Sequence, residues 1–88
     1  IVRVPRISTF YGITILMYFG DHPPPHFRAA YGEHRARVGL DGELLAGALP
    51  VRASGLVKLW VRLHHRELMA CWERVTRNEP PGTIAPLP

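Results

Sequence analysis

The segment Asp-His-Pro-Pro-Pro-His-Phe-Arg, residues 21–28, gathers the side chains of this chain that are best suited to chemistry. Each proline ring fixes φ and removes a backbone donor, so three consecutive prolines predict a stiff, extended loop rather than a helix interior or a central strand. Asp21 and His22 stand at one end of this loop, and His26 and Arg28 stand at the other. Imidazole and guanidinium groups on a rigid loop are more typical of a functional site than of a structural turn. We call residues 21–28 the proline segment.

The proline segment carries the groups that phosphate chemistry requires. A histidine acts as general acid or base near neutral pH, and an arginine neutralises phosphoryl oxygens. We therefore interpret Asp21, His22 and His26 as candidate catalytic residues of a metal-independent nuclease, in which Asp21 orients His22. Proteins that only bind phosphate carry the same groups, and histidines beside prolines also fix strand crossovers by bonding to the backbone. The sequence leaves open whether the protein is an enzyme.

The spacing of His22 and His26 also raises the question of a metal ion. In polyproline II geometry four residues advance about 12 Å, which nearly exhausts the reach of two imidazoles to one ion. A cis proline would shorten that distance, and Asp21 or His34 would be further donors, but no cysteine lies nearby. We predict no metal and no cofactor.

A second group of cations follows from a predicted hairpin. Gly32-Glu33 suits a two-residue type II′ turn between strands over 27–31 and 34–40. That register places Arg28 directly opposite Arg37, with His26 and Arg35 on the same polar face.

Like charges in such a pair destabilise a sheet unless solvent or an anion separates them. We therefore predict that Arg28, Arg35 and Arg37 form an anion-binding patch. The alternative is a solvated face with splayed side chains, and a one-residue slip in register would remove the patch altogether.

The elements that must position these groups are predicted as follows. Residues 1–9 form an entry segment. Residues 11–19 form a strand whose odd-numbered side chains face the core. Asp41-Gly42 predicts a type I′ turn into a fourth strand over 43–46, with Leu45 opposite Val38.

From Pro50 onward the apolar spacing becomes helical and predicts one long helix, or two joined by a kink near His64-His65. His64 fits the edge of the apolar stripe, whereas His65 is expected in solvent. Asn78 to Gly82 end the helix, and the tail is expected to dock Ile84 or Leu87. Residues 1–88 are therefore predicted as one α+β domain, an antiparallel meander of three to four strands packed against a C-terminal helical segment.

Length and charge restrict the partners. A chain of 88 residues builds a small core, which favours stabilisation by a homodimer or a tight protein partner. The formal net charge of +4 favours a polyanion or an acidic protein, although a basic balance for solubility is the alternative. The single cysteine, Cys71, excludes an intrachain disulfide and suits a reducing cytoplasm. No apolar run approaches the roughly 20 residues of a membrane span, and no signal peptide is expected.

The chain resembles a family of small bacterial proteins, domain-of-unknown-function family 4160. The residues that carry the resemblance are Ile7-Ser8-x-Phe10-Tyr11-Gly12-Ile13, Met17-Tyr18, Asp21-His22-x-Pro24-Pro25-His26-Phe27, Tyr31-Gly32-Glu33, Trp60, Leu63-His64, Glu67-Leu68 and Trp72-Glu73. The family typically reads His-Phe-His where this chain has His26-Phe27-Arg28. The loss of a third imidazole weakens a three-histidine metal site and favours anion binding.

The resemblance implies an association with toxin–antitoxin-like gene pairs. Our leading hypothesis is therefore the toxin of such a pair, held inactive by a cognate antitoxin-like protein and acting in the cytoplasm on a phosphate-bearing target such as RNA. The alternative is a non-catalytic nucleic-acid-binding or regulatory module. A third hypothesis is a small protein-interaction domain whose proline segment docks a partner.

Overall fold

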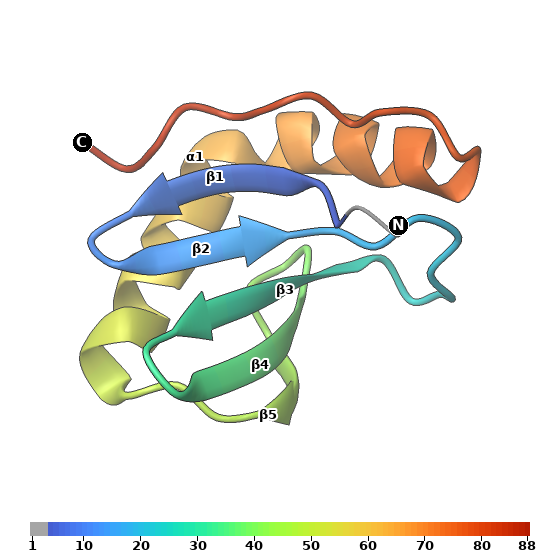
Figure 1. Ribbon diagram of the computed structural model, residues 1–88. Helices are drawn as coiled ribbons and strands as arrows, with labels where there is room; N and C mark the ends of the chain where they lie inside the picture. Colours follow the sequence, from blue (N-terminus) through green and yellow to red (C-terminus); the bar gives the residue numbers. More distant parts are fainter. Residues whose placement is uncertain (1–3) are drawn as a thin grey trace.

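The computed structural model describes residues 4–88, which form a five-stranded antiparallel sheet followed by one helix. The elements are β1 (Arg6–Phe10), β2 (Ile13–Leu16), β3 (His26–Tyr31), β4 (His34–Gly39), β5 (Leu44–Gly47) and α1 (Val51–Thr76). Each strand pairs with the next along the chain, so the sheet is a simple meander, and α1 crosses one of its faces (Figure 1). The predicted α+β meander under a C-terminal helix is confirmed, with five strands rather than three to four.

The extra strand lies at the N-terminal end. Residues 6–9 were predicted as part of an entry segment, but Arg6–Phe10 form β1 and pair with β2. Tyr11 and Gly12, with φ of 50° and 80°, turn the chain between the two strands. The prediction of one strand over 11–19 was therefore too long. The predicted core face is correct at its centre, where Ile13, Ile15 and Met17 are buried.

The β3–β4 hairpin has the predicted register throughout. Its Cα pairs are Tyr31↔His34, Ala30↔Arg35, Ala29↔Ala36, Arg28↔Arg37, Phe27↔Val38 and His26↔Gly39. Gly32 has φ of 56°, as the first position of a type II′ turn requires. The pairing of Arg28 with Arg37 is therefore a feature of the structure.

The next turn differs from the prediction by one residue. Gly39 and Glu43 close a three-residue loop in which the Gly42 N–H donates to the Gly39 carbonyl. Gly42 alone has a positive φ, and the Asp41 carboxylate accepts from the Glu43 N–H, as in a type I turn followed by a left-handed glycine. Leu44, rather than the predicted Leu45, consequently lies opposite Val38.

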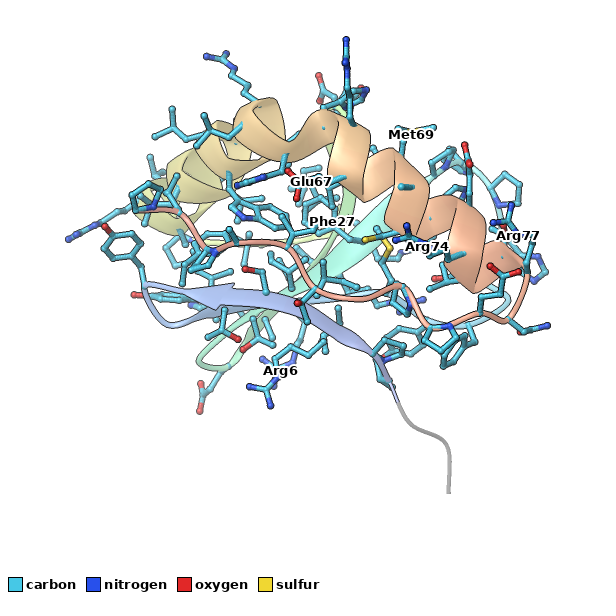
Figure 2. The ribbon with its side chains drawn as sticks, turned by 90° about the horizontal axis from the view of Figure 1, so that it is seen from above. Arg6, Phe27, Glu67, Met69, Arg74 and Arg77 are labelled. Carbon is cyan, nitrogen blue, oxygen red and sulfur yellow. The ribbon has the colours of Figure 1, made fainter. Side chains whose placement is uncertain are left out.

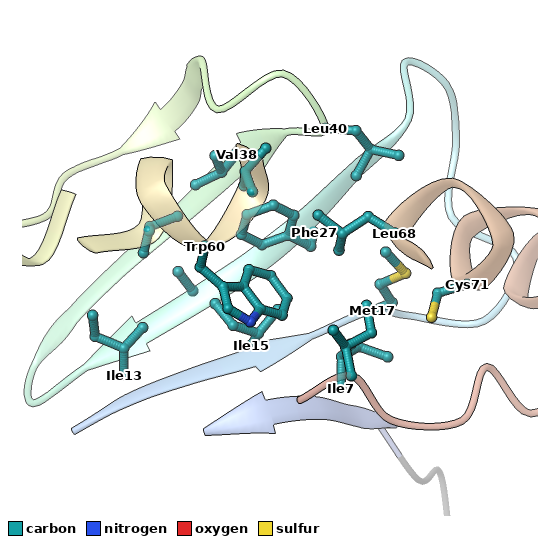
Figure 3. Packing of buried hydrophobic residues seen from close by; sticks show 14 of the residues in the cluster. Ile7, Ile13, Ile15, Met17, Phe27, Val38, Leu40, Trp60, Leu68 and Cys71 are labelled. Atoms are coloured by element: carbon teal, nitrogen blue, oxygen red, sulfur yellow. The ribbon is translucent and has the colours of Figure 1, made fainter. Parts of the chain in front are cut away.

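The core lies between the sheet and α1 (Figure 3). Trp60 is fully buried at its centre and packs edge-on against Phe27, with ring centroids 5.9 Å apart. Helix α1 has the predicted kink, because His64 has non-helical dihedral angles. His64 lies at the core edge as predicted. His65 is exposed as predicted, and its Nδ1–H also donates to the Leu40 carbonyl at 3.0 Å.

The C-terminal tail, residues 79–88, returns along the molecule between α1 and β1 (Figure 2). The Ile84 N–H donates to the Ile7 carbonyl at 2.8 Å, and the indole N–H of Trp60 donates to the Ala85 carbonyl at 2.9 Å. Ile84 is buried and Leu87 packs against the core, which confirms the predicted docking of the tail. The tail therefore joins the β1 edge to the helix.

Candidate anion-binding site

Asp21 is the centre of a polar network at the end of the proline segment. Its Oδ2 lies 2.9 Å from His26 Nε2 and accepts a hydrogen bond from Arg28 Nη2 at 3.2 Å. Its Oδ1 accepts from the backbone N–H of His22 at 3.1 Å. The His26 contact is an ion pair without good hydrogen-bond alignment. The carboxylate is thus held from three directions and connects the loop to β3.

His26 is buried and both of its nitrogens face oxygen atoms. Nδ1 lies 2.8 Å from the Pro24 carbonyl, which only accepts, so Nδ1 carries a proton. Nε2 faces the Asp21 carboxylate, and a neutral imidazole has only one N–H to offer. His26 is thus held between the loop backbone and the carboxylate of the same loop. The ring also packs against Trp72 of α1, with centroids 5.3 Å apart, so His26 fastens the proline segment to the helix.

The charge state of Asp21 follows from its neighbours. Partial burial opposes ionisation, but the hydrogen bonds from Arg28 and from the His22 backbone, with the charges of His26 and Arg28, outweigh it. The pKa of Asp21 is consequently below its usual value. Asp21 is therefore a carboxylate at neutral pH, and His26 and Arg28 are its side-chain partners.

Arg28 continues the network onto the face of the sheet opposite α1, which we call the outer face. Its guanidinium lies over the ring of Tyr18, 4.0 Å from the centroid, and one edge is held by Asp21. Its Nε–H is buried and has no hydrogen-bond partner among the described residues. About a third of the side chain is exposed. Arg28 is thus fixed in place while it still has an unused donor.

The outer face carries three further arginines. Arg37 is exposed opposite Arg28, and has no ion pair or side-chain hydrogen bond with any residue in the range 4–88. Arg35 is held at the hairpin turn, where it donates to the carbonyls of Gly32 and His34. Arg6 pairs with Leu16 and points away from α1 (Figure 2). Arg6 could not be assigned to this face from the sequence, because β1 was not predicted.

A shallow hollow of about 380 Å³ lies between these side chains. Leu16, Ala30 and Ala46 line it with apolar atoms, and Tyr18, Arg28 and Arg37 stand around it. Short side chains at the two alanines leave this space open. The outer face therefore combines cationic groups with a small apolar surface.

The predicted site residues separate into two groups. Asp21, His26 and Arg28 meet in one network, and Arg28, Arg35 and Arg37 share the outer face. His26 was predicted on this cationic face, which is wrong, because its ring is 3% exposed and turns toward Trp72. The His22 side chain is exposed and joins neither group. The catalytic roles of Asp21, His22 and His26 stay predictions.

Two other properties of the site bear on its chemistry. Residues 4–88 contain no group of three or more histidine, cysteine, aspartate and glutamate side chains arranged to hold a metal ion. Within the same range, no helix has both the length and the apolar character that a membrane crossing requires.

Comparison with known proteins gives the family. A family model described as Domain of unknown function (DUF4160) matches residues 12–73. That range begins at the turn before β2 and ends near the end of α1, so it contains the proline segment and the arginines of β3 and β4. No curated protein and no solved structure matches the chain. Because the matched range is well over half of its length, the chain belongs to the DUF4160 family.

Proposed function

We propose that the protein binds RNA through the outer face of its sheet and does so without cutting it. The observation that carries this proposal is the set of four arginines on that face. Among residues 4–88, only one carboxylate, that of Asp21, pairs with any of them, and its partner is Arg28. Unpaired guanidinium groups are the usual ligands of phosphate oxygens. A surface with several of them and little opposing charge favours a polyanion.

Binding accounts for the contacts of the proline segment better than catalysis does. A general acid or base must reach the proton that it transfers. His26 is buried, and both of its nitrogens are engaged by Pro24 and Asp21. Asp21 is in turn engaged by His26 and Arg28. The network therefore suits the positioning of Arg28, and no step of bond cleavage is part of the proposal.

The test is the salt dependence of binding to a fluorescent single-stranded oligoribonucleotide. Binding should weaken steeply as salt rises, because each neutralised phosphate releases counter-ions. Arg37→Ala should lower the affinity and reduce the slope of log K against log salt by about 0.7, the value expected for one phosphate contact on a single strand.

Arg62→Ala is the matched control, because Arg62 is also exposed but lies on α1, away from the outer face. It should change neither affinity nor slope beyond the small effect of net charge. The proposal fails if both arginine variants bind alike, or if affinity is the same at low salt and at about 1 M salt.

The wider proposal is that this binding makes the protein the toxin of a toxin–antitoxin pair, neutralised by a cognate protein. Its support is the exposed cationic face, which an acidic partner would cover. Induced expression without the neighbouring gene should arrest growth, and co-expression with that gene should restore it. The Arg37→Ala variant should be less toxic at equal abundance. Unimpaired growth without the neighbour would contradict this proposal.

A further inference from the structure

The hollow on the outer face differs from a flat cationic surface in having an apolar floor. Leu16 on β2, Ala30 on β3 and Ala46 on β5 supply that floor from three strands. Cross-strand register places Ala30 beside Arg35 and Ala46 beside Arg37, so each small residue lies next to a long cationic one. Phosphate binding alone requires no such floor.

Two arginines at the rim are placed to hold one anion. Arg28 and Arg37 are directly opposite each other on β3 and β4, where two positive charges repel unless an anion lies between them. Arg28 is already fixed by Asp21 and Tyr18, and about a third of its side chain is exposed. Arg37 is exposed and has no side-chain hydrogen bond or ion pair within residues 4–88. A phosphate between the two guanidinium groups would satisfy both.

From this arrangement we infer that the hollow seats one nucleotide unit of a single-stranded RNA. The base and ribose lie on the floor of Leu16, Ala30 and Ala46, and the phosphate lies between Arg28 and Arg37. The inference rests on the proposed function and adds to it a defined subsite.

Size and shape favour a single unstacked nucleotide over a duplex. The volume of about 380 Å³ is near the lower end of the range for small-molecule sites. A duplex buries its base faces and presents only backbone and groove edges, whereas a single strand exposes bases that bind apolar surfaces. The apolar floor would have no partner in a duplex backbone.

The experiment fills the hollow without changing any charge. Ala30→Leu adds apolar atoms to the floor, while every arginine of the outer face stays in place. It should weaken binding to an oligoribonucleotide at least tenfold and leave the salt slope unchanged. Ala46→Leu fills the hollow from β5 and should act in the same way, which protects the test against a folding defect of one variant.

Ala85→Leu is the control, because Ala85 is exposed in the tail on the helix side of the molecule. It should bind as the unchanged protein does. Circular dichroism and a melting curve for each variant ensure that only folded proteins are compared.

The outcomes separate this inference from the proposed function. If Arg37→Ala weakens binding while both hollow-filling variants bind normally, the face binds RNA by charge alone and the nucleotide subsite is refuted. If neither Arg37→Ala nor the filling variants weaken binding, both the nucleotide subsite and the proposed function are refuted. Uridine monophosphate titrated into the labelled protein should shift the backbone amide signals of Ala30 and Ala46, and inorganic phosphate at equal concentration should not. Equal shifts from both would also refute the subsite.

Discussion

Replacement of Asp21 by asparagine tests the role of the network most sharply, because it removes one charge with almost no change in shape. The buried His26 ring would lose the carboxylate that faces its Nε2, and Arg28 would lose the group that holds it in place. The asparagine oxygen still accepts the His22 N–H, so the turn itself can be retained. Asp21→Asn thus separates the electrostatic contribution of the network from the shape of the loop.

The magnitude follows from the exposure of the two partners. His26 Nε2 is buried and faces Asp21, and leaving a buried polar group without its partner costs about 1–3 kcal/mol. The contact to Arg28, which is about a third exposed, contributes at most about 1 kcal/mol because solvent screens it. Asp21→Asn should therefore lower the free energy of unfolding by about 1–4 kcal/mol, and the melting temperature by at least about 4 °C.

Urea unfolding followed by tryptophan fluorescence is a suitable assay, because Trp72 packs against His26. Glu33→Gln is the matched control: Glu33 is exposed at the β3–β4 turn and has no ion pair with the described residues. Its effect should stay within about 0.5 kcal/mol. A loss of less than about 1 kcal/mol for Asp21→Asn would refute the reasoning.

The same variant gives a pH signature. Because the pKa of Asp21 is lowered by folding, its contribution to stability is complete above the unfolded value of about 3.8 and is lost as pH falls through the folded value. The stability difference between the unchanged protein and Asp21→Asn should therefore shrink below about pH 3.8. A difference that persists unchanged at lower pH would show that the carboxylate charge is not its source.

Three further predictions concern the scaffold. Ile84→Ala should destabilise the protein by about 2–4 kcal/mol in urea unfolding, because Ile84 is buried where the tail joins β1; a change below about 1 kcal/mol would mean that the tail contributes little. Gly47→Ala should detach β5, because Gly47 has φ of 78° and a Cβ there would overlap the Arg35 carbonyl; amide hydrogen exchange should accelerate in β5 and not in β2. Burial raises the pKa of the Cys71 thiol, so its reaction with a disulfide reagent at neutral pH should be slow and should accelerate with urea; rapid reaction of the native protein would contradict its burial.

Where one turn residue fixes a pairing, the sequence was sufficient to predict the structure. Gly32 at the first turn position determined the whole β3–β4 register, including the opposition of Arg28 and Arg37. The helical period after Pro50 likewise predicted α1, because the apolar spacing is a local repeat.

The wrong predictions arose where a local sequence pattern is compatible with two backbone structures. Asp41-Gly42 is compatible with a type I′ turn and also with a three-residue loop, and the hydrogen bond from the Glu43 N–H to Asp41 favours the second. Tyr11 is an unexpected residue at positive φ, so β1 and the place of Arg6 were missed.

The position of His26 shows a different limit. Strand alternation places it on the outer face, but its contact with Trp72, far along the chain, turns the ring into the interior. No periodicity within β3 contains that information, because only the path of α1 determines which end of the sheet is covered. The sequence thus predicted which residues make up the candidate site. It did not predict that these residues divide into a buried network and an exposed cationic face.

Mapping the surface that RNA contacts tests the central claim most directly. In two-dimensional NMR spectra of the labelled protein, a short single-stranded oligoribonucleotide added at low salt should shift the amide signals of β3, β4 and β5, with the largest changes at Arg28, Arg37 and Ala46, and addition of salt should reverse them. The signals of α1 around Arg62 should stay in place. Shifts confined to α1, or no shifts at all, would contradict the claim that the outer face binds RNA.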